Sequence, residues 1–171
     1  MNKILLNLLI IVMASNQINA QKDILSAFQK KWDNSRNYLI ELAETMPEDK
    51  FDFRPTERQM SFQEQLLHIR KNMVWISESY FADESQPKSD KIDPKSKAEF
   101  LAELRKAFDN VSKIIENVSP DHLSDEVKFF NGPKTKFQML NLLQDHVTHH
   151  RGQLVVYLNL NDLTPPRYRG W

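Results

Sequence analysis

Four segments of the chain carry apolar residues at three- and four-residue steps, the spacing of one helix face. The first expected helix covers residues 23–44, and the second begins at Ser61. The third begins near Ser96, and the fourth covers residues 136–160. The last three open with a serine or threonine followed three positions later by glutamate or glutamine, which is capping-box spacing. Four amphipathic helices of this length predict an all-α fold, a four-helix bundle with long crossing links.

The links between the expected helices differ in composition and expected path. Residues 48–60 are a polar link that contains Phe51 and Phe53. Residues 82–93 are polar, and we expect them to cross the bundle between the second and third helices. The link before the fourth helix contains the turn Asn131-Gly132-Pro133, and a short extended piece is expected at residues 126–130.

The N-terminal residues 1–20 have the pattern of a cleaved secretory signal peptide. Lys3 supplies the positive start, an apolar run follows over residues 5–14, and Ala20 provides a small residue at the cleavage position. A membrane anchor is the alternative, but the run is shorter than the roughly 20 residues that cross a bilayer. We therefore expect an exported protein, periplasmic or secreted, whose single domain is residues 21–171, with no stable membrane span after processing.

Charge and cysteine content narrow the function classes. The chain has 23 basic and 23 acidic residues, and loss of Lys3 with the signal peptide leaves 22 against 23, a net charge of −1. Such a balance argues against nucleic acid as a partner. The absence of cysteine excludes disulfides, a lipoprotein anchor, a cysteine nucleophile and thiolate metal ligands. Any metal ligands must then be His, Asp or Glu.

The segment 145–153 holds three of the five histidines of the chain. His146 and His150 are four positions apart, so on a helix they lie on one face, one turn apart, where both can reach one ion. His149 points away from His146. A third ligand would come from His68, which lies on the second helix and could face the fourth, or from His122, for which a loop position as a cap or in solvent is the simpler place. On a helical wheel His68 lies at the flank of the second helix, which fits a site at the edge of the bundle. The alternative is that His68 is a polar boundary residue.

Several pieces of the sequence together resemble the DinB-like (DinB/YfiT) superfamily of four-helix-bundle metalloproteins. The most specific is His146-Val147-Thr148-His149-His150-Arg151-Gly152-Gln153. The others are Phe53-Arg54-Pro55 followed by Ser61-Phe62 and Leu67-His68-Ile69, the ending from Leu158 to Pro165-Pro166, and the size of the domain. The resemblance covers residues 22–170.

The resemblance implies a three-histidine site for a divalent metal, with His68, His146 and His150 as ligands. Zinc is the first expectation for nitrogen ligands, followed by nickel, iron or manganese. Arg151 and Gln153 are candidates for hydrogen bonds behind the ligands, although Arg151 can equally pair with a surface acid. Asp145 is a weaker candidate, since a solvated charge is the simpler reading. Gly152 is expected to let a neighbouring helix approach closely.

Three protein ligands leave coordination positions open, which is the catalytic arrangement. We therefore expect a metal-dependent hydrolase-type enzyme acting on an unidentified small molecule. No HExxH motif is present, so the sequence assigns no catalytic base. Tyr157 is a candidate for the pocket lining, with the core as its simpler place. The alternatives are a non-catalytic metal- or partner-binding bundle and a thiol-dependent transferase, which export disfavours because small thiols belong to the reducing cytosol.

The resemblance also implies pairing of bundles through their helices. Two features offer surfaces for such a homodimer. One is the polar gap at Ser35 in the apolar stripe of the first helix, and the other is the aromatic and basic tail, residues 167–171.

Overall fold

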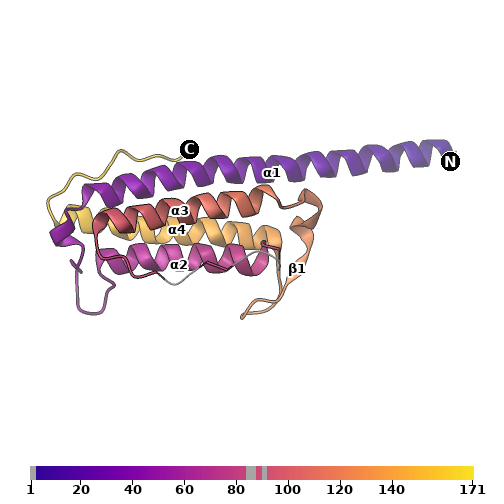
Figure 1. Ribbon diagram of the computed structural model, residues 1–171. Coiled ribbons are helices and arrows are strands. Elements are labelled where there is room, and N and C mark those ends of the chain that lie inside the picture. Colours follow the sequence, from indigo (N-terminus) through magenta and orange to yellow (C-terminus); the bar gives the residue numbers. More distant parts are fainter. Residues whose placement is uncertain (1–2, 84–87, 90–91) are drawn as a thin grey trace.

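Four helices lie side by side in the computed structural model, which describes residues 3–83, 88–89 and 92–171, with side chains from Asp23 onward (Figure 1). They are α1 (Lys3–Thr45), α2 (Phe62–Tyr80), α3 (Lys97–Glu116) and α4 (Lys136–Leu160). Helices α1 and α2 each contact both α3 and α4, so α1 and α2 occupy opposite corners of the bundle. The predicted all-α, four-helix-bundle architecture is confirmed.

The N-termini of α2 and α4 are closed by the capping boxes that the sequence predicts. At α2 the Ser61 side chain accepts from the backbone N–H of Glu64, whose carboxylate accepts from the Ser61 N–H at 2.6 Å. At α4 Thr135 and Gln138 make the same reciprocal pair, at 3.2 and 2.9 Å. Because these boxes fix where α2 and α4 begin, they also fix the register of every later side chain on the two helices.

At α3 the predicted capping box is only half formed. The Ser96 side chain accepts from the N–H of Glu99 at 3.3 Å, but the Glu99 carboxylate accepts from the N–H of Lys95 instead of Ser96. The preceding link, residues 82–93, lies partly outside the described residues. In Figure 1 the C-terminus of α2 and the N-terminus of α3 lie at opposite ends of the bundle.

Helix α1 starts earlier than the sequence pattern predicts. It ends one residue after the expected position but begins at Lys3 instead of residue 23. The stretch 3–45 contains no glycine or proline and is rich in leucine and other helix formers, so nothing interrupts the helix. A helical backbone does not test the signal-peptide prediction. Within the described part of the chain, none of the helices combines the length and apolar character needed to cross a membrane.

The link between α1 and α2 holds the start of α2 in place. It contains the 3₁₀ turn Glu48–Lys50, after which Phe51 is buried. The backbone N–H of Phe62 donates to the carbonyl of Phe53, and the N–H of Gln63 donates to the carbonyl of Phe51, both at 2.9 Å. The first turn of α2 is therefore anchored to the preceding link by two backbone hydrogen bonds.

The link between α3 and α4 contains a 3₁₀ turn, Pro120–Ser124, and a two-stranded antiparallel ladder. Strand β1 (Glu126–Val127) pairs with β2 (Lys134–Thr135). The extended piece predicted at residues 126–130 is thus present but shorter. It stops because the chain turns back at Gly132, whose φ of +105° suits glycine and whose N–H donates to the Phe129 carbonyl.

One correction concerns Ser35, which the sequence suggested as part of a dimer surface. Ser35 is fully buried inside the bundle, and its hydroxyl accepts from the Gln144 amide at 2.8 Å. A polar residue in an apolar stripe need not face solvent when a neighbouring helix supplies a hydrogen-bond partner. The tail follows α1 (Figure 1), where the Asn34 amide donates to the Arg169 carbonyl, while Trp171 remains largely exposed.

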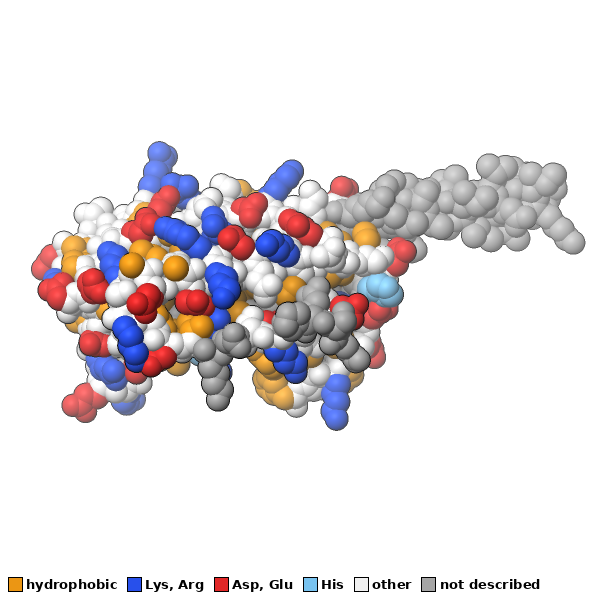
Figure 2. Space-filling view, viewed as in Figure 1, with side chains coloured by type: hydrophobic (Ala, Val, Ile, Leu, Met, Phe, Trp, Pro, Cys, Tyr) orange, Lys and Arg blue, Asp and Glu red, His pale blue; other side chains and the backbone are white. Residues whose placement is uncertain are grey.

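Surface charge is mixed in sign. Figure 2 shows basic and acidic side chains interspersed across the visible face of the bundle, without a large area of one sign. This pattern agrees with the balanced composition of the chain.

Candidate metal centre

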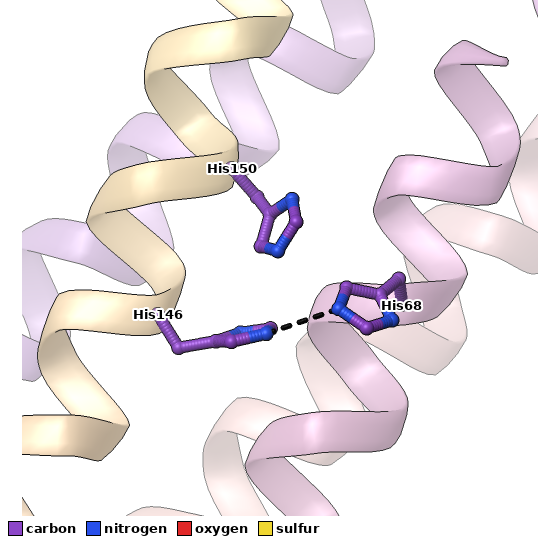
Figure 3. Close-up of side chains that lie close together, drawn as sticks. All are labelled: His68, His146 and His150. Atoms are coloured by element: carbon purple, nitrogen blue, oxygen red, sulfur yellow. Dashed lines mark hydrogen bonds between the residues drawn. The ribbon is translucent and has the colours of Figure 1, made fainter. Parts of the chain in front are cut away.

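Three histidines from two helices meet between α2 and α4. Nε2 of His68 on α2 lies 3.1 Å from Nε2 of His146 on α4. The ring centre of His150 lies 4.6 Å from that of His68 and 4.5 Å from that of His146. One nitrogen from each ring can be chosen so that all three lie within 4.8 Å of one another. Figure 3 shows the three rings converging on one small space, which two helices therefore share.

Helix geometry explains why these rings converge. His146 and His150 are one turn apart on α4, and the buried residues Val147 and Leu154 turn this side of the helix towards the bundle. His150 is buried, whereas His146 and His68 are half-buried. The intermediate exposure of His68 agrees with its predicted place at the flank of α2. The group therefore lies at the edge of the core, accessible from one side.

The environment favours neutral imidazoles. Burial, followed by the nearby positive charge that His150, His68 and His149 would carry, lowers the pKa of His146 to about 4. Burial and then His68 and His149 lower the pKa of His150 to about 4 as well. The pKa of His68 is also lowered, first by burial and then by Lys71. At neutral pH all three rings thus keep a lone pair for a ligand.

The donor set fits a divalent transition metal. Zinc–nitrogen bonds of about 2.0–2.1 Å in a tetrahedron place ligand nitrogens about 3.4 Å apart. The 3.1 Å separation of His68 and His146 is already close to that value, and the 4.8 Å limit for the whole group requires only a small side-chain adjustment. Neutral nitrogen ligands without carboxylate suit zinc and the later first-row metals better than calcium or magnesium.

A glutamine that the sequence reasoning missed supports the site from behind. Gln65 is buried on α2, and its Oε1 lies 2.6 Å from Nδ1 of His150. Its amide nitrogen donates to the Tyr157 hydroxyl at 3.3 Å and to Oε1 of Gln153. The signal for Gln65 is present in the sequence: it is three positions before His68, on the same side of α2.

Gln153 and Tyr157, both singled out from the sequence, join this network. Gln153 does not touch a histidine of the cluster, but it contacts Gln65 and lies 2.9 Å from Nε2 of the exposed His149. Tyr157 is buried, as its simpler interpretation predicted, and its hydroxyl donates to the Met60 carbonyl at 2.7 Å. By contrast Nδ1 of His146 is buried and has no hydrogen-bond partner among the described residues.

Other candidates lie away from the cluster. Arg151 is buried on a different side of α4, where its guanidinium donates to the Ser35 hydroxyl and stacks 4.8 Å from the Tyr38 ring centre. Asp145 is exposed. The expectation for Gly152 is wrong: Gly152 is exposed, and a Cβ built on it meets nothing within 4 Å. No helix packs there, because Gly152 lies on the solvent side of α4.

His122, the other candidate third ligand, lies in the link after α3. It is exposed, and its Nδ1 lies 2.7 Å from the Asp125 carboxylate. The structure therefore groups His68, and not His122, with His146 and His150 of α4.

A cleft of about 460 Å³ opens beside the cluster, with His68 in its wall. The link between α1 and α2 forms one side and the exposed side of α2 the other. Its lining includes Arg54, Arg58 and Lys71 together with Glu57 and Glu64. Arg54 is paired with Glu64 at 3.3 Å. A small molecule in this cleft would lie next to His68.

The family model "DinB family" matches residues 16–169. Because this match covers most of the sequence, the chain belongs to the DinB family.

Individual relatives of this chain are DinB-like proteins as well. The uncharacterized protein YjoA of Bacillus subtilis (strain 168) is 25% identical over 126 residues, which are 72% of this chain and 81% of YjoA. The crystal structure of that DinB-like protein has a TM-score of 0.70 at 22% identity, covering 83% of this chain and 96% of its own. A DinB-like protein from Bacillus cereus ATCC 10987 has a TM-score of 0.72 at 18% identity, covering 84% and 97%. These two structures establish the shared fold.

Proposed function

We propose that this DinB family protein is an exported, metal-dependent enzyme of the hydrolase type, with His68, His146 and His150 as metal ligands. The observation that supports it most is the convergence of three imidazole nitrogens within 4.8 Å, one of which belongs to His68 in the wall of an open cleft. When bound, a divalent cation supplies Lewis acidity towards a substrate oxygen or water. Three protein ligands leave room for that substrate.

The chain itself positions the ligands and the approach of a substrate. His150 is buried and held by Gln65, so one ligand is rigid. His68 lies at the boundary between the cluster and the cleft, where a substrate can approach. The cleft wall carries charged side chains of both signs, which can bind polar groups of a small molecule.

Metal content is the first test. Protein purified without a polyhistidine tag is analysed for transition metals, and we expect close to one equivalent, with zinc as the main metal. The His146→Ala variant should lose it, whereas His149→Ala, which alters an exposed neighbouring ring, should retain it. Less than about half an equivalent in the native protein, with no further loss in His146→Ala, would remove the metal proposal.

Catalysis needs a separate test. Metal-loaded protein is screened against chromogenic carboxylic esters, phosphate esters and amides, with His146→Ala as the inactive control. Turnover that follows metal content supports a hydrolase. A fully loaded protein that turns over none of these substrates supports the non-catalytic metal- or partner-binding bundle instead, and turnover only with an added small thiol supports the thiol-dependent transferase.

Export is tested on the full chain in cells. We expect the mature protein outside the cytoplasm with an N-terminus near Gln21, which N-terminal sequencing would establish. A cytoplasmic protein that keeps residues 1–20 would contradict export and would also make thiol chemistry more plausible.

A further inference from the structure

A chain of hydrogen bonds leads from a backbone carbonyl to the most buried histidine of the cluster. The Met60 carbonyl can only accept, so the single Tyr157 hydroxyl proton, 2.7 Å away, must point at it. The Tyr157 oxygen is then left as an acceptor towards its other neighbour, Gln65, at 3.3 Å. The group of Gln65 that faces Tyr157 must therefore be its amide nitrogen.

This fixes the other end of the amide. With its nitrogen towards Tyr157 and towards Oε1 of Gln153, Gln65 presents Oε1 to Nδ1 of His150 at 2.6 Å. Both amide hydrogens and the amide oxygen then have partners, which a buried side chain requires. Because an amide oxygen can only accept, Nδ1 of His150 must carry the proton.

We infer that Gln65, oriented by Tyr157, is a positioning residue that locks His150 in the Nδ1–H tautomer and so presents the Nε2 lone pair to the cluster. In Figure 3 Nε2 of His150 points into the space between His68 and His146, while Nδ1 is turned away from it. The expected gain in metal affinity rests on the proposed metal site. The tautomer itself is a property of the metal-free protein.

His146 provides an internal contrast. Its Nδ1 is buried without a hydrogen-bond partner among the described residues, so no comparable device holds its ring. Its Nε2 lies 3.1 Å from Nε2 of His68, and in the metal-free protein one of these two neutral rings must donate to the other. Of the two cluster histidines on α4, His150 is therefore the one prepared for binding before any ligand arrives.

The direct test is nitrogen NMR of metal-free protein labelled at histidine, in which the two ring nitrogens report which one carries the proton. The native protein should show His150 with a protonated Nδ1 and an unprotonated Nε2 at pH 7. In Gln65→Met, a proton on Nδ1 would lack an acceptor, so His150 should shift towards the Nε2–H form. Gln65→Glu keeps an acceptor oxygen towards Nδ1 and should keep the proton on that nitrogen, although it removes the amide donor to Tyr157 and Gln153.

Zinc affinity is measured on the same proteins. Loss of a partner that orients a metal ligand costs about 10–100-fold in affinity. We expect this loss in Gln65→Met and a smaller one in Gln65→Glu, whose carboxylate still accepts from His150, a difference that mere disruption of packing would not produce. An Nε2–H tautomer in the native protein, or an unchanged tautomer in Gln65→Met, would overturn the inference.

The native spectrum decides the tautomer even if Gln65→Met fails to fold. Failure of the metal proposal is recognised separately, because zinc binding would then be insensitive to His146→Ala while the tautomer could still be read.

Discussion

Nε2 of His68 lies 3.1 Å from Nε2 of His146, although 78 positions separate the two residues in the chain. The capping boxes at Ser61 and Thr135 set the register of the helices that carry them, and α2 packs directly on α4. With the ring centre of His150 4.6 Å from that of His68, the three residues form a group whose nitrogens could share one ligand.

The stability of the metal-free protein should depend on pH through this cluster. Because the folded-state pKa of His146 and His150 is about 4, below the ordinary 6.5, the unfolded chain binds more protons between these values. Stability should be fully present above about pH 6.5 and fall as the pH drops towards 4. Urea unfolding in excess chelator at several pH values measures it. Replacing the three histidines by glutamine should flatten this slope, and an equally steep slope in that variant would refute the assignment.

Gly152→Ala should stabilise the protein. Gly152 is exposed within α4, and an added Cβ meets nothing within 4 Å, so helix propensity alone decides the effect. The expected gain is about 1 kcal/mol, measured by urea or thermal unfolding. Zinc affinity should not change. A loss of stability or of metal binding would mean that another helix or partner does approach this position.

Arg151→Met should reduce stability without affecting metal affinity. The buried guanidinium donates to Ser35 and stacks on Tyr38, so its removal should cost about 1–3 kcal/mol. The exposed Arg167→Met is the matched control and should cost almost nothing. Urea unfolding and zinc titration separate the two effects. A loss of zinc affinity greater than about tenfold in Arg151→Met would restore this residue to the surroundings of the metal.

The two serine caps should differ. Ser61 is fully buried and belongs to a complete capping box, whereas Ser96 makes only one half of its box. Replacement by alanine should cost about 1–2 kcal/mol at Ser61 and about 0.5 kcal/mol at Ser96. Thermal unfolding of both variants checks this order. Equal costs would show that the burial of Ser61 adds nothing to the strength of its side-chain cap.

Local signals in the sequence accounted for most of the fold. Apolar steps and capping residues predicted the start of α2 and both ends of α4, because these depend on contacts within a few positions. The start of α1 was missed, since the composition of residues 3–22 is compatible with both a helix and a targeting segment. The burial of Ser35 was missed because its partner Gln144 comes from a different helix, and no local pattern reveals such a pair.

The candidate site was likewise predictable only where it depends on neighbouring positions in the sequence. Helical spacing alone placed His146 beside His150, but the choice of His68 as the third member depended on the family resemblance. Gln65 was missed because a single glutamine on an amphipathic helix looks like an ordinary surface residue. Its role is visible only once the α2–α4 packing brings it 2.6 Å from His150.

Zinc titration of chelator-treated, untagged protein tests the central claim most directly. Calorimetry at pH 7 should show one zinc ion per chain in the native protein and in His149→Ala. Affinity should fall at least about 100-fold in His68→Ala, His146→Ala and His150→Ala, because each removes a ligand and not merely its support. Unchanged zinc affinity in these three variants, with the fold intact by circular dichroism, would contradict a metal centre built from the three histidines.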